Sequence, residues 1–220
     1  MTIPERSQAQ FQTENWVSTP LLQKAFTRAQ AAHQGQFRKS GEPYFIHCLA
    51  AAQSLVEWGV TDETLLSACL LHDVVEDTDL VLDQLRYQFG EEVAFLVDGV
   101  TKLKSADSIG EGETLRKVVS MTYMDPRVAL IKLADRLHNL STISSLPEER
   151  QKRIAKETLD VYTGLAESLG IWVVKTQMED LAYSILFPDE FRKIKEEIDS
   201  DPRLSNDFCV YIRTNIERLL

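Results

Sequence analysis

The chain has 220 residues, of which 44% are hydrophobic and 26% are charged, a balance typical of a globular protein with a buried core. Its apolar runs, such as 65–71, are too short to cross a bilayer, and residues 1–10 lack the apolar stretch of a secretory signal. A net charge of −10 argues against nucleic-acid binding, which needs a broad basic face, although a local basic cluster can still bind a small anion.

The spacing of apolar residues predicts helices along almost the whole chain. Apolar residues recur every three or four positions without convincing two-residue alternation, so we expect an all-α fold. Gly59, Gly90 and Gly170 are natural helix ends, and Pro147 is a natural helix start. Helices are predicted at 20–34, 46–58, 61–76, 80–89, 91–101, 113–124, 127–145, 148–168, 171–187, 188–199 and 203–219.

The predicted organisation is one domain over residues 1–202, a bundle of about ten helices, followed by a C-terminal amphipathic helix over 203–220. In this tail, apolar residues recur at three- and four-residue intervals: Phe208, Ile212, Ile216 and Leu219. An apolar stripe must be covered, so we expect the tail to fold back onto the helices near 171–199. The alternative is contact with its counterpart in a second chain, which would make a homodimer.

Two polar, glycine-bearing segments are predicted to be loops with a function. Residues 35–44 contain Gly35, Gly41 and Pro43, and lie between two predicted helices. Residues 104–112 (KSADSIGEG) are a candidate for a mobile flap.

The segment richest in potential catalytic or metal-binding side chains is His72-Asp73-Val74-Val75-Glu76-Asp77. It directly follows the apolar run 65–71. On a continuous helix, His72 would share a face with Glu76, and Asp73 with Asp77, because residues four apart lie on one side. Carboxylates this close repel one another unless a cation or shared protons relieve them. A solvated helix end is the alternative interpretation of this segment alone.

Two further residues complete a candidate metal site. His47 lies at the start of the predicted helix 46–58, and Asp135 lies among apolar neighbours, which predicts that its carboxylate faces inward. A buried acid must be paired, protonated or bound to a metal. The candidate ligands are two imidazoles and two carboxylates: His47, His72, Asp73 and Asp135. Such a set suits Mn²⁺, Fe²⁺ or Zn²⁺, and we interpret His33 and His138 as structural.

Four sequence blocks together resemble the hydrolase domain of the RelA/SpoT homologues. These blocks are 38–47 (RKSGEPYFIH), 72–78 (HDVVEDT), 97–103 (VDGVTKL) and 132–139 (KLADRLHN). The resemblance extends from about Ala25 to about Ile194. It implies an HD-domain helical bundle that removes pyrophosphate from the 3′ position of (p)ppGpp, giving GDP or GTP, usually with Mn²⁺.

The resemblance also implies roles for individual residues. The metal ligands would be His47, His72, Asp73 and Asp135. The catalytic acids would be Glu76 and Asp77. The substrate-binding residues would be Arg38, Lys39, Ser40 and Asn139. The chain departs from the family pattern at several positions: Cys48, Ser141, Gly164, Glu167 and Ser168. None of these departures removes a proposed ligand or acid, although the loss of a positive charge at Ser141 weakens the case for phosphate affinity.

These residue types suit phosphate-ester hydrolysis. A metal lowers the pKa of water and polarises the phosphate, and Glu76 or Asp77 would handle the proton, although spacing does not assign which is acid or base. The planar guanidinium of Arg38 can stack on guanine or pair with a phosphate. Asn139 follows Asp135 by one helical turn and would face the same pocket.

Two alternative functions remain open. One is an HD phosphohydrolase that acts on a deoxynucleotide or a 3′-phosphorylated cofactor. The other is a non-catalytic alarmone-binding module, against which the intact Glu76 and Asp77 argue. The chain is too short to add the synthetase domain of the long family members, so we expect a stand-alone hydrolase, with a fragment of a long enzyme as the alternative. The three scattered cysteines, Cys48, Cys69 and Cys209, favour a reducing compartment, and we expect the cytoplasm.

Overall fold

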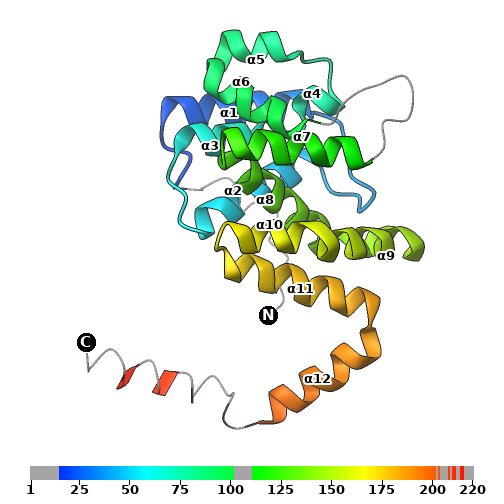
Figure 1. Cartoon of the computed structure of the whole chain (residues 1–220). Helices are drawn as coiled ribbons and strands as arrows, with labels where there is room; N and C mark the ends of the chain where they lie inside the picture. Colours follow the sequence, from blue (N-terminus) through cyan, green and yellow to red (C-terminus); the bar gives the residue numbers. More distant parts are fainter. Residues whose placement is uncertain are drawn as a thin grey trace.

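The structure is a computed structural model. It describes residues 15–101 and 111–201, together with residues 203, 208, 210, 211, 214 and 215 of the tail. The described residues are almost entirely helical, which confirms the all-α prediction (Figure 1). The helices are α1 (Pro20–Ala32), α2 (Tyr44–Glu57), α3 (Glu63–Leu70), α4 (Val74–Asp77), α5 (Leu82–Phe89), α6 (Glu91–Val100), α7 (Glu111–Met124), α8 (Arg127–Ser141), α9 (Glu148–Glu157), α10 (Thr163–Ser168), α11 (Trp172–Leu186) and α12 (Pro188–Ser200).

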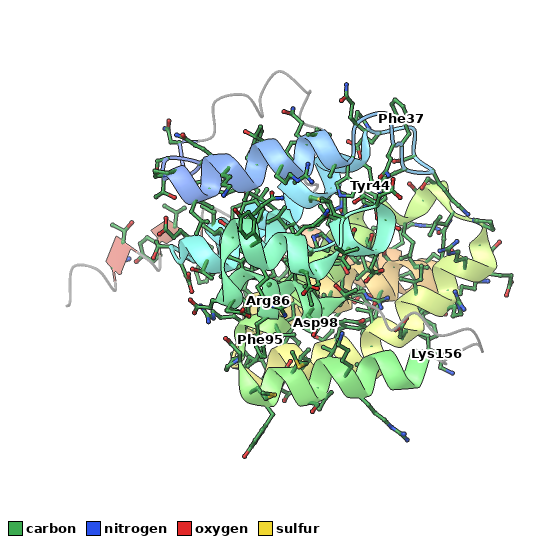
Figure 2. The ribbon with its side chains drawn as sticks, turned by 90° about the horizontal axis from the view of Figure 1, so that it is seen from above. Phe37, Tyr44, Arg86, Phe95, Asp98 and Lys156 are labelled. Atoms are coloured by element: carbon green, nitrogen blue, oxygen red, sulfur yellow. The ribbon has the colours of Figure 1, made fainter. Side chains whose placement is uncertain are left out.

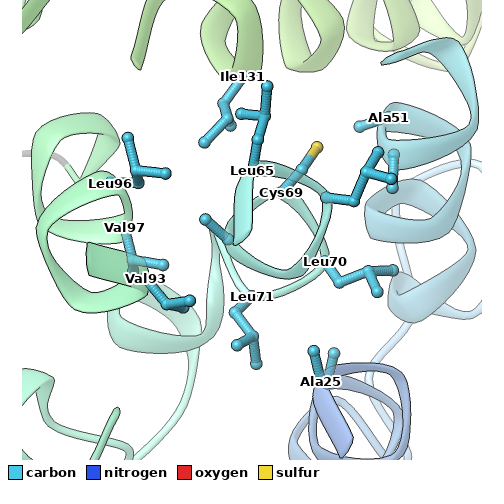
Figure 3. Close-up of a cluster of buried hydrophobic side chains, with 14 of the residues drawn as sticks. Ala25, Ala51, Leu65, Cys69, Leu70, Leu71, Val93, Leu96, Val97 and Ile131 are labelled. Atoms are coloured by element: carbon cyan, nitrogen blue, oxygen red, sulfur yellow. The ribbon is translucent and has the colours of Figure 1, made fainter. Parts of the chain in front are cut away.

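α3 is the central helix of the fold. Residues 65–71 are all buried, which is typical of a helix that is covered on every side. α3 packs against α1, α2, α6 and α8. Figure 3 shows Leu65, Leu70 and Leu71 pointing towards different neighbouring helices. His72 and Asp73 directly follow this buried helix and therefore also lie in the interior of the protein.

α8 connects two hydrophobic clusters. Ile131 and Ala134 belong to the larger cluster with α1, α2, α3, α5 and α6. Leu133, Leu137 and Leu140 belong to a second cluster formed with η2 (Ile143–Ser145), α10 and α11. Because α8 is packed on both sides, its orientation is fixed, and so is the position of Asp135, which lies between these apolar residues.

The predicted helix 61–76 is interrupted. α3 begins after Asp62, whose carboxylate accepts hydrogen bonds from the amides of Thr64 and Leu65, and it ends at Leu70. Residues 71–73 form a turn, and α4 then restarts for only four residues. The apolar run 65–71 is followed by Val74 and Val75, so the apolar pattern gives no sign of this turn.

The predicted helix 148–168 also has an internal irregularity. α9 is followed by a π-helical turn, η3 (Thr158–Tyr162), before α10 begins. Arg136 of α8 contacts this turn, with its guanidinium 4.0 Å from the Tyr162 ring centroid and an ion pair to Glu157. A π-turn has a wider hydrogen-bonding pattern than an α-helix, so the residues of α10 are rotated relative to those of α9.

Two predictions lie wholly or mostly outside the described residues. These are the flap at 104–112, of which only the beginning of α7 is described, and the tail helix at 203–219. α12, the last complete helix before the tail, contacts α11, buries none of its residues and projects away from the other helices in Figure 1. None of the described helices is long and apolar enough to span a membrane.

Candidate metal centre and substrate loop

Four predicted metal ligands come together from three parts of the fold. His47 lies in the first turn of α2, His72 and Asp73 lie in the turn between α3 and α4, and Asp135 lies on α8. His47 Nε2 is 3.5 Å from Asp73 Oδ2 and 3.2 Å from Asp135 Oδ1. His72 Nε2 is 3.2 Å and 3.9 Å from the same two oxygens. These atoms therefore surround one small volume.

Both imidazole rings direct Nε2 towards this volume because their other nitrogen has a partner elsewhere. His72 Nδ1 lies 2.7 Å from the carbonyl oxygen of Cys69, to which it donates. His47 Nδ1 lies 2.8 Å from Nδ1 of His138. Partners at the far nitrogen orient metal-binding histidines in proteins generally. The ring orientations are therefore those that metal ligation requires.

The charged groups of the cluster shift one another's pKa values. Burial disfavours the ionised form of Asp73, but His72 and His47 outweigh it and hold the pKa of that carboxyl well below its usual range. Burial likewise opposes protonation of His72, yet the Asp73 carboxylate raises the pKa of His72 to about 9. The carboxylates thus favour a positive charge, either a proton or a cation, at a buried site.

Asp135 is held by two neighbours on its own helix. Asn139 Nδ2 donates to Asp135 Oδ1 at 2.5 Å, and Lys132 Nζ lies 3.5 Å from Oδ2. Burial alone would raise the pKa of Asp135, but Lys132 and then His47 lower it. Asp135 is therefore ionised, with Oδ1 facing the histidines.

The cluster fits a divalent cation. The ligand atoms of His47, His72 and Asp73 lie within 4.8 Å of one another, and Asp135 Oδ1 adjoins both imidazoles. Nε2 of His72 is buried and makes no hydrogen bond in the described part of the chain. A metal ion bound here would replace the proton that the neighbouring carboxylates otherwise favour on this nitrogen. Two nitrogen and two oxygen donors suit a first-row transition metal.

The predicted acids lie one turn beyond this cluster. Glu76 and Asp77 are carried by α4, where Glu76 is half-buried and Asp77 is exposed. The hydroxyl of Tyr44 lies 2.6 Å from Asp77 Oδ2 and 2.9 Å from Asp73 Oδ2. Burial, and then the charge of Asp73, raise the pKa of Tyr44, so this phenol remains a hydrogen-bond donor.

The loop at 35–43 brings a basic residue to the same place. The amide of Arg38 donates to Glu42 O, and that of Gly41, which has a φ of +87°, donates to Arg38 O, so the loop is a tight turn. Arg38 Nη2 donates to Asn139 Oδ1 at 2.6 Å. Lys39 and Ser40 lie exposed at the tip. The structure thus brings Arg38 and Asn139 to the cluster, whereas among the described residues no hydrogen bond or ion pair joins Lys39 or Ser40 to it.

Three residues that adjoin the site were not predicted from the sequence to belong to it, and one of them, His138, was interpreted as structural. Tyr44 precedes His47 by three residues, and His138 follows Asp135 by three, so helical spacing places each beside a predicted ligand. Gln36 donates from Nε2 to the carbonyl oxygen of Asp77, and no pattern in the sequence indicates this contact. Figure 2 shows Phe37 at the outer edge of the loop and Tyr44, at the start of α2, nearer the middle of the molecule.

A helical bundle with paired histidines and aspartates at its centre defines a class of protein, and comparison with known families identifies that class. Residues 25–172 match the family model described as "HD domain". This match covers most of the chain, so the chain belongs to the HD-domain family. An HD domain implies dependence on a divalent metal, for which the His/Asp cluster is a possible site.

Curated relatives extend the similarity. The chain is 49% identical over 176 residues to a "Probable GTP pyrophosphokinase" of Mycobacterium leprae (strain TN), covering 79% of this chain and 22% of the relative. It is 45% identical over 175 residues to a "Guanosine-3′,5′-bis(diphosphate) 3′-pyrophosphohydrolase" of Aquifex aeolicus, covering 79% and 25%. It is 45% identical over 181 residues to the "Bifunctional (p)ppGpp synthase/hydrolase SpoT" of Escherichia coli K12, covering 80% and 26%. The chain thus spans about a quarter of the length of these relatives.

This chain is similar to a solved structure, and the match covers nearly the full length of that structure. That structure is described as "A metazoan ortholog of SpoT hydrolyzes ppGpp and plays a role in starvation responses". The match has a TM-score of 0.54 at 29% identity, and covers 80% of this chain and 96% of that one. Together, these comparisons confirm the resemblance to the hydrolase domain of RelA/SpoT homologues.

Proposed function

We propose that this chain is a metal-dependent hydrolase that removes pyrophosphate from the 3′ position of (p)ppGpp and leaves GDP or GTP. The observation that carries the proposal is the series of hydrogen bonds from Arg38 through Asn139 to Asp135. This series attaches the basic loop to the His/Asp cluster. The names of the Aquifex and Escherichia relatives, and the ppGpp hydrolysis ascribed to the metazoan SpoT ortholog, support the same substrate.

The proposed metal ligands are His47, His72, Asp73 and Asp135, and the proposed ion is Mn²⁺. The mixed nitrogen and oxygen donors support a transition metal of this kind. When bound, the ion would supply Lewis-acid polarisation of the phosphate and activation of water. The partners at the far nitrogens of both imidazoles support the choice of these four residues.

The proposed reaction adds water to the phosphorus atom nearest the ribose, breaks the bond from that phosphorus to O3′, and delivers a proton to O3′. Glu76 and Asp77 are the proposed proton-handling groups, since α4 carries them three and four residues after the proposed ligand Asp73. Arg38 would pair with a phosphate through its planar guanidinium. Lys39 and Ser40, exposed on the same turn, are proposed to contact the nucleotide.

Release of pyrophosphate from ppGpp by the parent protein, with Mn²⁺ and after chelation, tests this function. We expect turnover with Mn²⁺ and none after the metal is removed. Deoxynucleotides and 3′-phosphorylated dinucleotides, assayed in parallel, test the alternative substrates. Rapid cleavage of one of these, with ppGpp left intact, would reject the proposed substrate. Tight ppGpp binding without cleavage would indicate a non-catalytic module.

We further propose a cytoplasmic location and a domain that ends near residue 202. The free, buried thiols of Cys48 and Cys69 support a reducing compartment. The exposed α12 supports a domain limit near this point, because no residue of α12 is buried by the helices that precede it.

A further inference from the structure

The hydroxyl of Tyr44 touches two carboxylates with different proposed tasks. Its oxygen lies 2.9 Å from Asp73 Oδ2, which belongs to a proposed metal ligand, and 2.6 Å from Asp77 Oδ2, which belongs to a proposed proton-handling group. A phenol has one proton, so it donates to one carboxylate at a time while the other stays within reach. The two carboxylates therefore share one donor. The distance between them cannot exceed what a hydroxyl in hydrogen-bonding range of both allows.

The helix that carries Asp77 has little to hold it in place by itself. α4 is four residues long, only Val74 is fully buried, and the side chain of its N-cap, Asp73, makes no capping hydrogen bond. A single helical turn is marginal without tertiary contacts. The amides of Glu76 and Asp77 donate to Asp73 O, which fixes the backbone of this turn, but the position of the Asp77 carboxylate depends on groups outside α4.

The ring of Tyr44 is well placed to provide that support. It stacks on His33 with the centroids 4.8 Å apart and an angle of 16° between the planes, and it meets the His47 ring edge-on at 6.0 Å. His33 Nδ1 lies 2.8 Å from Gln36 Oε1, and Gln36 Nε2 donates to the carbonyl oxygen of Asp77 at 2.7 Å. Because the Gln36 amide uses its nitrogen on Asp77, its oxygen faces the His33 ring and accepts from Nδ1–H. Tyr44 and Gln36 thus hold the side chain and the main chain of the same residue.

We propose that Tyr44 is a positioning residue that keeps the carboxylate of Asp77 at a constant distance from Asp73, and so aligns the acid–base group with the metal centre. The proposal rests on the proposed function for the task of Asp77. The contacts themselves do not depend on which nucleotide is cleaved. Tyr44 acts through the two carboxylates and needs no contact with the substrate.

The test compares the parent with Tyr44→Phe, which removes the hydroxyl and keeps both ring contacts. With ppGpp and Mn²⁺, we expect kcat to fall about tenfold or more while KM stays nearly unchanged, as for other groups that orient a metal ligand or a catalytic group. The Mn²⁺ dissociation constant, titrated without substrate, should rise several-fold because Asp73 loses a donor. Tyr87→Phe is the matched control, since Tyr87 is 93% exposed and the chemical change is identical.

A double-mutant cycle decides whether Tyr44 acts through Asp77. In an Asp77→Ala background, Tyr44→Phe should cost little further kcat, because the group that it positions is gone. Equal kcat in Tyr44→Phe and the parent, or full additivity with Asp77→Ala, would overturn the proposal. A parent that cleaves no nucleotide, with weaker Mn²⁺ binding in Tyr44→Phe, would reject the proposed function and retain the positioning role towards Asp73.

Discussion

Arg38 Nη2 donates a 2.6 Å hydrogen bond to Asn139 Oδ1, although 101 positions separate the two residues in the sequence. Asn139 uses its amide nitrogen on Asp135, so the guanidinium and the carboxylate are joined through one side chain. A substrate phosphate that pairs with Arg38 would therefore lie beside the metal cluster.

Replacing Arg38 with alanine should raise KM for ppGpp about tenfold or more, because a hydrogen-bonded charge pair with the phosphate is lost. The Mn²⁺ dissociation constant should stay close to that of the parent, since Arg38 is not a ligand. Arg38→Lys should restore only part of the affinity, because a lysine cannot reproduce the planar fork. Arg192→Ala, at an exposed arginine of α12, is the control. An unchanged KM in Arg38→Ala would remove this residue from the substrate site.

Replacing Asp73 with alanine should abolish both metal binding and turnover. Asp73 Oδ2 is the oxygen that both His47 Nε2 and His72 Nε2 approach, so its removal leaves two imidazoles facing one remaining carboxylate. Metal analysis of the parent should find about one divalent ion per chain. Asp199→Ala, at an exposed aspartate of α12, should behave like the parent. Full metal content in Asp73→Ala would place the metal site elsewhere.

Replacing Glu76 or Asp77 with alanine should lower kcat by about a hundredfold or more while leaving the metal bound, as expected for positioned proton-handling groups. Asp79→Ala, at an exposed acid two residues beyond Asp77, should have little effect. This comparison separates catalysis from a solvated acidic helix end. Loss of metal from either of the first two variants would instead make that residue a ligand.

Replacing His138 with alanine should weaken Mn²⁺ binding about tenfold or more, because His47 Nδ1 loses the partner that orients its ring. Burial, followed by the charges of His47 and Arg38, lowers the pKa of His138 to about 3, so His138 is neutral. A metal at Nε2 of His47 requires the hydrogen of that ring on Nδ1, and His138 Nδ1 would then accept it. His138→Asn offers an amide oxygen as acceptor and should recover part of the affinity. Parent-like binding by His138→Ala in a Mn²⁺ titration would limit this histidine to packing.

Replacing Arg127 with alanine should destabilise the fold without changing the site. Arg127 bonds Asp62, Asp125 and Glu92, and so ties the start of α8 to the starts of α3 and α6. We expect a loss of about 1–2 kcal/mol at pH 7, since Asp62 and Glu92 are exposed enough for screening to weaken their share. Arg86→Ala, which removes two exposed ion pairs, should leave stability nearly unchanged.

The pH dependence of that loss has a definite sign. The hydrogen bond from Arg127 lowers the pKa of Asp125 in the folded protein, so this pair stabilises the fold above the unfolded-state pKa of an aspartate, about 4. The contribution is lost progressively as the pH falls from that value through the lower folded-state pKa of Asp125, where the carboxyl becomes protonated. In urea unfolding, the difference between the parent and Arg127→Ala should therefore be full at pH 7 and shrink as the pH is lowered from about 4. A difference that stays constant would mean that packing, not charge, carries the effect.

The sequence alone determined the helical class and the chemistry available to the chain. Three- and four-residue periodicity predicted most of the helices, because burial of one face requires that spacing in any helix. The apolar neighbours of Asp135 predicted that its carboxylate faces inward. The spacing of four residues predicted that Asn139 lies one helical turn after Asp135, on the same face of the helix. These are properties of single helices, and local spacing is enough to show them.

Tertiary structure decided how these residues meet. Tyr44 reaches Asp73 across 29 positions and His47 reaches His138 across 91, and neither contact can be read from spacing, because both depend on how helices cross. The turn at 71–73, which interrupts the predicted helix 61–76, has the same origin. A continuous helix would fix the direction of His72 and Asp73 by its own axis. The turn instead lets both side chains face α2 and α8, where the other ligands lie.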